Sequence, residues 1–408
     1  MQKYSAGHGR DLGRPPVPAA LRTVLAMIGS GEASSRAAIA RLTGLARSTV
    51  SQQVDALIEQ GIVEETEVSA SVRGRPPRRI SISPRAGSIA VADVDVGSTQ
   101  VAIADLSGQI IARDVVRIPV DHGPEELLGA VIEQVRSLLA DHDRGASFLR
   151  HVVAGLPAPV DFRRRRVVRP PIMPGWDGYA IGDHLEAAFG CPVTVDNDVN
   201  LMALGVAAQE QTDTPLLFVK VAAGIGAGIV TDDGVVHRGA DGAAGDIGHV
   251  QTATRRDVVC RCGKLDCLEA VASYRAVLAD LGIPESPADD PSQAPRELAR
   301  LVSDSDAQAL FRVRQAAGDI GEVVAMLIHT LNPRTLVLGG PLSEFHDEIL
   351  SGVRAAVYER ALPLATRQLT ITTSQLGADA GVTGAVVLAT REVFSSDGVA
   401  RILAASRD

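Results

Sequence analysis

The sequence predicts an α/β protein in which a small N-terminal winged helix-turn-helix unit precedes a larger, two-lobed α/β body. Two observations support this division. Residues 1–85 carry twelve Lys and Arg against seven Asp and Glu, a net charge of +5, whereas residues 86–408 carry −14. Residues 88–118 then alternate in the manner of three strands joined by two tight turns. A chain of 408 residues has room for two or three domains of this kind.

The head begins with two short predicted helices. Residues 21–29 form an apolar helical stretch, and residues 34–44 form a second one. Ser34 or Ser35 is suited to cap the second helix, because a serine hydroxyl accepts a hydrogen bond from the first free backbone N–H groups. Gly44 supplies the turn that follows. This is the expected start of a helix-turn-helix.

The third predicted helix covers residues 46–61 and is stopped by Gly61. One face carries apolar residues at helical spacing, namely Val50, Val54, Leu57 and Ile58. The opposite face carries polar side chains that suit base edges and phosphates in a major groove. These candidate DNA-binding residues are Arg47, Ser48, Thr49, Ser51 and Gln52. The alternative is a winged helix that binds another protein.

Two short predicted strands, residues 62–68 and 78–83, enclose a basic tip that contains Gly74-Arg75-Pro76. A narrow minor groove concentrates negative potential, and an arginine held extended by a following proline can enter it. We therefore expect Arg73 and Arg75 to bind DNA, with an ordinary solvated hairpin as the alternative. The positive charge of the head against an acidic body points to an anionic partner for the head alone.

Glycine-rich turns mark the body. The first, VADVDVGSTQVAIADL, resembles the first phosphate loop of the actin-like sugar kinase fold. Asp95 would approach a metal-bound phosphate there, and the following residues would offer N–H groups and hydroxyls to anionic oxygens. Two more such turns follow at residues 221–230 and 336–342. The candidate phosphate- or nucleotide-binding residues are Asp95, Gly97, Ser98, Thr99, Gly224, Gly226, Gly339 and Gly340.

Asn197 and Asp198 lie between a predicted strand and a predicted helix. A carboxylate at this position could accept a proton from a sugar hydroxyl and so act as a general base. The alternative is a helix cap, since Asn and Asp both cap helices well. The local sequence leaves both interpretations open.

A histidine and three of the four cysteines share one stretch, as His249, Cys260, Cys262 and Cys267. Thiolates and imidazole are the ligands that zinc prefers, and four of them close a tetrahedral site, so we expect a structural zinc ion. A chance cluster of buried thiols is the alternative. A disulfide is disfavoured because C-x-C is too tight and no secretory segment is present. The fourth cysteine, Cys191, is expected to be a buried core thiol.

The chain resembles the ROK family, which groups sugar-responsive repressors with sugar kinases, from roughly residue 20 to 395. The block GAAGDIGHV…CRCGKLDCLEAVAS matches the family's G-E-x-G-H…C-x-C-G-x-x-G-C-x-E motif. The resemblance implies a two-lobed actin-like ATPase (ribonuclease H-like) fold, with zinc on the four ligands named above. It also implies a sugar site formed by Asn197, Asp198, Asp246, His249 and Glu269. In a kinase member Asp198 would be the catalytic base, and residues 377–389 resemble the family's closing helix.

Four positions depart from the family pattern. Asp246 replaces a usual Glu, Ala223 replaces the Thr of kinases, Ile172 stands where kinases often have Asn, and Asp266 replaces a Gly of the zinc loop. The first three remove or shift polar contacts, which weakens the case for phosphoryl transfer more than the case for sugar sensing. Together with the N-terminal winged helix they favour the repressor branch, and they leave ATP and magnesium binding open.

The resulting prediction is a sugar-responsive, DNA-binding transcriptional regulator of repressor type. Its expected domains are residues 1–85, 86–200 and 201–408, with the last helix returning to the N-terminal lobe. Its expected partners are operator DNA, a sugar or sugar derivative, and a second copy of the chain, with a tetramer as an extension. The alternatives are an active ATP-dependent sugar kinase of the hexokinase or glucokinase type that carries a DNA-binding head, and a binding module without DNA specificity.

The expected location is the cytoplasm. The N-terminal residues lack an apolar core of signal-peptide length. No run of about 18 apolar residues suggests a membrane span.

Overall fold

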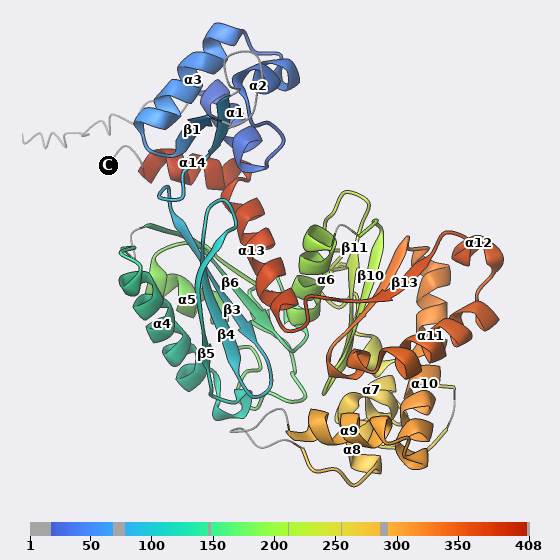
Figure 1. Ribbon diagram of the computed structural model, residues 1–408. Coiled ribbons are helices and arrows are strands. Elements are labelled where there is room, and N and C mark those ends of the chain that lie inside the picture. Colours follow the sequence, from blue (N-terminus) through green and yellow to red (C-terminus); the bar gives the residue numbers. More distant parts are fainter. Residues whose placement is uncertain are drawn as a thin grey trace, which may run out of the picture. The chain divides into compact units, whose positions relative to one another are not determined.

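The computed structural model describes residues 18–67, 78–145, 148–210, 212–253, 255–285 and 293–405 (Figure 1). The chain forms two compact units, Met1–Ala86 with Arg391–Asp408, and Gly87–Thr390. The predicted fold class is confirmed: a winged helix and a body of two α/β lobes. None of the described helices combines the length and the apolar character that a membrane crossing requires.

The smaller unit is the winged helix. Its elements are α1 (Ala19–Gly29), α2 (Arg36–Thr43), α3 (Arg47–Glu59), β1 (Val63–Glu67), β2 (Arg78–Ile82) and α14 (Ser396–Ala405). Of the two candidate caps, Ser35 is the one used, because its hydroxyl accepts from the N–H of Ala38. β1 and β2 pair antiparallel. The basic tip with Arg73 and Arg75 lies outside the described residues.

Helix α14 is a part of this unit that the sequence analysis did not anticipate. It packs against α1 and buries Val399, Ile402 and Leu403. Just before it, the ring of Phe394 occupies the space where Gly29 of α1 would otherwise carry a Cβ. The winged helix is therefore built from both ends of the chain.

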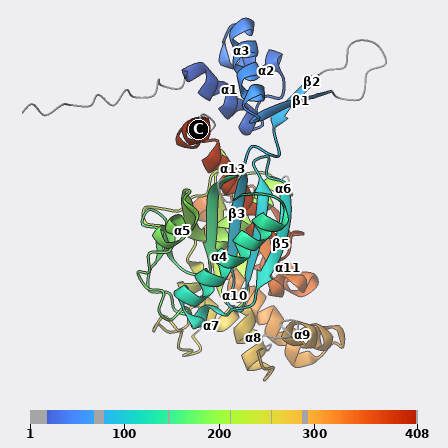
Figure 2. The same cartoon turned by 90° about the vertical axis from the view of Figure 1, so that its left-hand side faces the viewer.

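The first lobe of the larger unit is a five-stranded sheet of order β5-β4-β3-β6-β9. Its strands are β3 (Ser88–Val94), β4 (Thr99–Asp105), β5 (Ile110–Val116), β6 (Leu149–Leu156) and β9 (Val193–Asn197). The first three pair antiparallel, as predicted for residues 88–118, and β6 and β9 add in parallel. Helices α4 (Pro124–Asp141) and α5 (Ile181–Phe189) lie over the sheet (Figure 2) and enclose an aliphatic core around Trp176. Cys191 is 7% exposed in this core, and burial raises the pKa of its thiol to about 12.

The second lobe is a four-stranded sheet of order β11-β10-β12-β13. Its strands are β10 (Leu216–Val221), β11 (Ile225–Val230), β12 (Thr335–Gly339) and β13 (Thr370–Thr373). Its main helices are α6 (Asp198–Gln209), α7 (Leu268–Ala272), α8 (Tyr274–Asp280), α9 (Gln293–Ser303), α10 (Ala307–Leu331), α11 (His346–Arg360) and α12 (Pro363–Thr366). The strands and α7, α8, α10 and α11 share one apolar core.

The smaller elements are the hairpin β7 (Val160–Asp161) and β8 (Arg166–Val167), and the short 3-10 helices η1 (Val120–His122), η3 (Ile247–His249) and η4 (Pro341–Glu344). Among them η3 carries His249, one of the predicted site residues.

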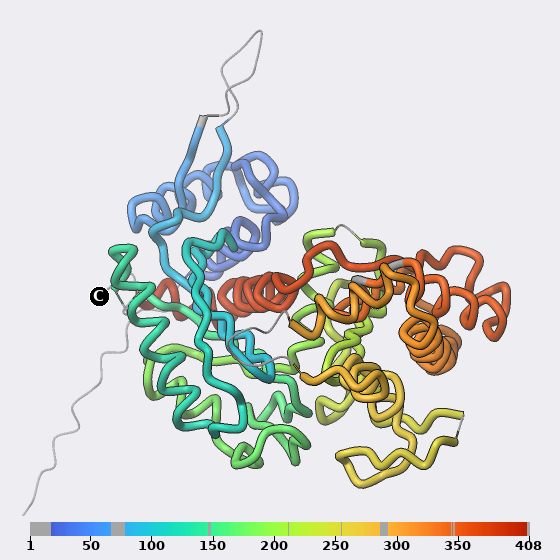
Figure 3. Tube along the Cα trace, turned by 60° about the horizontal axis from the view of Figure 1, so that its bottom comes forward, coloured from blue at the N-terminus to red at the C-terminus, as the bar shows by residue number. Residues whose placement is uncertain are grey.

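Helix α13 (Asp379–Val393) runs between the two lobes, next to α6 (Figures 1 and 3). The two helices approach so closely that a Cβ on Gly384 would overlap the carbonyl of Leu201, and one on Gly205 would overlap that of Ala380. A Cβ on Gly381 would likewise meet the carboxylate of Asp93 on β3. Glycine at these positions lets α13 contact the two elements that flank the site.

Candidate functional site

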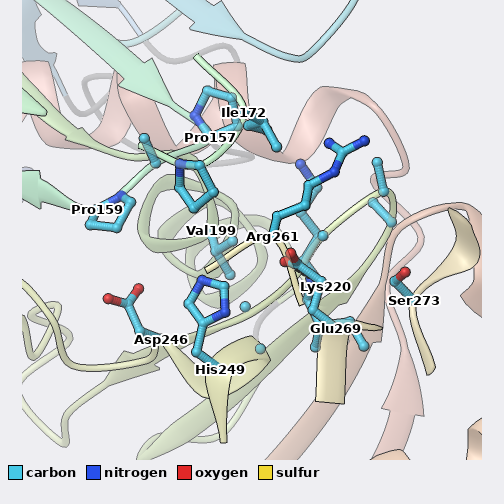
Figure 4. Close-up of a pocket in the computed structure, with 18 of the residues that line it drawn as sticks. Pro157, Pro159, Ile172, Val199, Lys220, Asp246, His249, Arg261, Glu269 and Ser273 are labelled. Atoms are coloured by element: carbon cyan, nitrogen blue, oxygen red, sulfur yellow. Dashed lines mark hydrogen bonds between the residues drawn. The ribbon is translucent and has the colours of Figure 1, made fainter. Parts of the chain in front are cut away.

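A cavity of about 270 Å³ lies in the larger unit, where the turn between β10 and β11 faces the first lobe (Figure 4). All five predicted sugar-binding residues line it: Asn197, Asp198, Asp246, His249 and Glu269. Part of the wall is apolar, with Pro157, Pro159, Ile172 and Val199. A concave site of this kind, with a few polar groups on an apolar wall, suits a small polar ligand.

Of the two roles that the sequence left open, helix cap and site carboxylate, Asn197 takes the first and Asp198 is placed for the second. Asn197 is the N-cap of α6: its Oδ1 accepts from the N–H groups of Val199 and Asn200, and its Nδ2 donates to the carbonyl of Ala158 at 3.1 Å. Its side chain therefore holds the junction of β9 and α6 in place. Asp198 is the first residue of the helix, and its carboxylate faces the cavity.

Lys220 of β10 binds Asp198. Its Nζ lies 2.7 Å from Oδ2 of Asp198 and 3.8 Å from Oδ1 of Asp95. Burial raises the pKa of Asp198, and the ammonium opposes that rise. Burial alone would lower the pKa of Lys220, but the carboxylates of Asp198 and Asp95 outweigh it and raise that pKa, so the ammonium stays charged.

The remaining polar groups come from the segment around η3 and α7. Asp246 precedes η3 and stays exposed at the rim of the cavity. Glu269 lies on α7, and its Oε2 accepts from the N–H of Ile225 at 3.3 Å. The ring of His249 lies between the cavity and the cysteine cluster. These groups offer acceptors and one ring nitrogen to a ligand with several hydroxyls.

The four predicted metal ligands come together. One ligand atom each from His249, Cys260, Cys262 and Cys267 lies within 4.8 Å of the others. The Sγ atoms of Cys262 and Cys267 are 3.7 Å apart, as are Nδ1 of His249 and Sγ of Cys260. Tetrahedral zinc–thiolate bonds of about 2.3 Å put sulfur atoms about 3.8 Å apart, whereas a disulfide needs about 2 Å. The cluster can therefore hold a metal ion, and its cysteines are free thiols.

The metal loop is tied to the rest of the lobe by charged side chains that the sequence analysis missed. Arg256 donates to Asp319 of α10 at 2.7 Å, and both Arg256 and Arg312 donate to the carbonyl of Val271 at the end of α7. Asp266, which replaces the family's usual Gly, accepts from the N–H groups of Arg256 and Val258. These bonds fix the loop and α7 together, and with them Glu269.

Only some of the predicted phosphate-binding residues line the cavity. Asp95, Gly224 and Gly226 line the cavity, whereas Gly97, Ser98, Thr99, Gly339 and Gly340 do not. Thr99 is fully buried, and its hydroxyl has no hydrogen-bond partner among the described residues. Gly339 leaves room for the ring of Phe218, and Gly340, with φ at 87°, lies against the carbonyl of Val221. Packing contacts thus account for glycine at both positions of the third turn, and its role in nucleotide binding stays a prediction.

The exposed side of α3 matches the predicted DNA-binding face. Val50, Val54 and Leu57 are buried, while Ile58 is only half-buried. Of the five candidates on this helix, Arg47, Ser48 and Gln52 are exposed and Thr49 and Ser51 are half-buried. The helix is held by Arg36 of α2, which pairs with Asp55 and Glu65.

Comparisons with known proteins agree with both units. The ROK family model matches residues 91–392, and the MarR family model matches residues 17–73. The xylose repressor of Caldicellulosiruptor bescii is 26% identical over 383 residues, which cover 91% of this chain and 95% of that protein.

Two solved structures are similar. A ROK family transcriptional regulator, a homologue of the Escherichia coli Mlc protein, matches with a TM-score of 0.76 and 22% identity, over 95% of this chain and 98% of the other. The ROK hexokinase of Thermus thermophilus matches with a TM-score of 0.61 and 29% identity, over 75% of this chain and 99% of that one. The hexokinase thus lacks a counterpart for a quarter of this chain.

Proposed function

This chain belongs to the ROK family, and we propose that it is a sugar-responsive, DNA-binding transcriptional regulator of repressor type. The observation that carries the proposal is the presence in one chain of a MarR-type winged helix and a cavity lined by hydroxyl-pairing side chains. Relatives named xylose repressor and N-acetylglucosamine repressor support the same assignment.

The ligand of the cavity is a sugar or a sugar derivative. Asp246, His249 and Glu269 line the cavity together (Figure 4), and Asp198 lines it as well. Acceptors that line a cavity in this way, with Asp198 buried, favour a ligand with hydroxyls, because a ligand without them would leave the buried acceptor unpaired. The sugar can shift the protein between two conformations only if it binds one of them more tightly than the other, and the shift is set by that difference in affinity.

The metal is a structural zinc ion on His249, Cys260, Cys262 and Cys267. Three thiolates and one imidazole fill all four positions of a tetrahedral site, which leaves none for water or substrate. His249 would bind through Nδ1, the nitrogen near Cys260, which leaves Nε2 for a ligand. One residue thus links the metal to the sugar site.

The proposed DNA site is a palindromic operator bound by a homodimer in the cytoplasm. A symmetric dimer presents two α3 helices about one turn of DNA apart, which matches a palindromic site. The basic charge of residues 1–85 supplies the attraction to phosphates.

A DNA-binding and sugar-response experiment tests the proposal. The full-length protein should select a specific sequence from genomic fragments, and one class of a panel of pentoses, hexoses and amino sugars should change its affinity for that sequence. Glu269→Ala should bind the same DNA but lose this response, because it removes an acceptor of the cavity. Glu297→Ala, an exposed glutamate on α9, is the matched control and should respond normally. DNA binding without sequence preference, or without a response to any sugar, would contradict the proposal.

Gln52 should set part of the base preference. It is exposed on the N-terminal half of α3, the part of a recognition helix that reaches base edges. Gln52→Ala should weaken operator binding by about 1–3 kcal/mol and relax the preference at one position of the site. Gln60→Ala, at the far end of the same helix, is the matched control and should bind with parental affinity. The affinities of Gln52→Ala and Gln60→Ala for the operator and for operators with single base changes measure this. If the two substitutions weaken binding equally, α3 is not the helix that reads the bases.

A further inference from the structure

Lys220 is the one lysine in an apolar stretch, and its position is unusual. The chain has three lysines, and this one lies on β10 between the fully buried Val219 and Val221. Its side chain is 15% exposed and ends in the cavity between two carboxylates, Asp198 at 2.7 Å and Asp95 at 3.8 Å. Burying a charge is costly unless it is paired, so Lys220 and the buried Asp198 need each other, whereas Asp95, whose side chain is 68% exposed, is the weaker partner.

The two carboxylates follow two strands of the same first-lobe sheet, β3 and β9. Asp95 lies in the turn between β3 and β4, and Asp198 starts α6. A third carboxyl group, Asp93, lies near them: burial and then Asp198 raise its pKa to about 8, while Lys220 opposes this rise. Three carboxyl groups thus share one ammonium, whose nearest partner is Asp198.

The residues present do not fit a magnesium–nucleotide complex. In a kinase of this fold the carboxylate at Asp95 would approach a metal-bound phosphate, but here an ammonium already occupies the space between Asp95 and Asp198. The facing turn carries Ala223, which has no hydroxyl to offer a phosphate oxygen.

Asp198 is also poorly placed to act as a base. Its Oδ1 accepts from the N–H of Val199 at 2.9 Å, and its Oδ2 accepts from Lys220. Proton transfer from a sugar hydroxyl would neutralise the carboxylate and leave the buried ammonium without its closest partner. A hydroxyl can still donate a hydrogen bond to Asp198 without giving up its proton.

We propose that Lys220 is a permanent internal counter-ion that takes the place of a metal–nucleotide complex, so that the cavity binds its sugar without nucleotide. This inference rests on the proposed function only in calling the ligand a sugar. Lys220 thereby sets the charge of the cavity and keeps Asp198 as a binding residue. The cavity needs neither ATP nor magnesium to reach its binding-competent state.

Thermal unfolding of the full-length protein with magnesium tests the ion network directly. At matched ionic strength, neither MgCl₂ nor magnesium with a non-hydrolysable ATP analogue should raise the Tm of the parent. Lys220→Met should lower the Tm by roughly 10 °C, because it leaves the buried carboxylate of Asp198 unpaired. Added Mg²⁺ should recover part of this loss, because a divalent ion can pair with the same carboxylates. Arg367→Met, which removes an exposed cation of the second lobe, is the matched control and should show neither effect.

A double variant keeps the test decisive if Lys220→Met does not fold. Lys220→Met with Asp198→Asn removes both partners of the ion pair and should regain most of the lost Tm. A double variant no more stable than Lys220→Met would overturn the proposal, as would a parent that binds the nucleotide analogue or consumes ATP when a sugar is added. If the parent does not bind operator DNA, the proposed function is contradicted, but the Tm measurements still test the role of Lys220. Failure of the proposed function and failure of this inference are therefore distinguishable.

Discussion

Cys262→Ser should lose the bound metal ion and lower the free energy of unfolding of the larger unit. Cys262 is the exposed member of the cluster, so its replacement changes little packing, and the loss of stability reports on the metal itself. Zinc binding contributes on the order of 10 kcal/mol in small peptides, and we expect about half of that here, because a large core supports the loop. Metal content and urea unfolding of the purified protein measure the two effects.

The same variant should lose its response to sugar. Without the metal, Nδ1 of His249 keeps only the Sγ of Cys260 at 3.7 Å, a weak partner that lets the ring turn away from the cavity. Cys267 is the N-cap residue of α7, so a loosened loop also releases the helix that carries Glu269. Two groups of the sugar site therefore depend on the metal.

Cys191→Ala is the control for this experiment. Cys191 is the chain's remaining cysteine and lies in the core of the first lobe. Its replacement should leave the metal content and the sugar response unchanged. Full metal occupancy in Cys262→Ser, or a parent that contains no metal, would exclude the predicted site.

Elements with strong local signals could be predicted from the sequence. Helix α2 begins after Ser35 and ends at Gly44 because those residues satisfy and terminate the backbone hydrogen bonds of a helix. The His and Cys side chains that come together could be named because C-x-C and a nearby histidine leave few other arrangements, while their binding of a metal stays a prediction. In these cases residues close in the chain determine the outcome.

Features that depend on distant partners could not be predicted. The pattern of α14 indicates an apolar face but not that it would pack on α1. The contacts of Gly339 with Phe218 and of Gly340 with Val221 also join distant segments, and the sequence of this turn did not indicate them.

The role of Lys220 was missed for a related reason. A lysine within LLFVKVAAG is a visible anomaly in a buried strand, but its partners, Asp95 and Asp198, are 125 and 22 residues away in the chain. Only the folded arrangement shows which carboxylates it pairs with.

Removing the C-terminal helix should abolish operator binding although the recognition helix stays intact. Deletion of residues 394–408 removes Phe394 from the surface of Gly29 and withdraws the buried side chains of Val399, Ile402 and Leu403. Burial of each such side chain contributes about 1.5–3 kcal/mol, so their combined loss is comparable to the total stability of a small domain. The winged helix should therefore unfold or become mobile, while the cavity, which lies wholly within residues 87–390, should still bind sugar.

Two substitutions in α14, Ile402→Ala and Arg401→Ala, distinguish the effect of lost packing on DNA binding from the effect of lost charge. Ile402 is buried and should show a weaker form of the deletion, with faster proteolysis of the winged helix and reduced DNA affinity. Arg401 is exposed on the same helix and should behave as the parent. A truncated chain that binds operator DNA with parental affinity would show that the winged helix folds without α14, and that residues 1–86 alone form the DNA-binding domain.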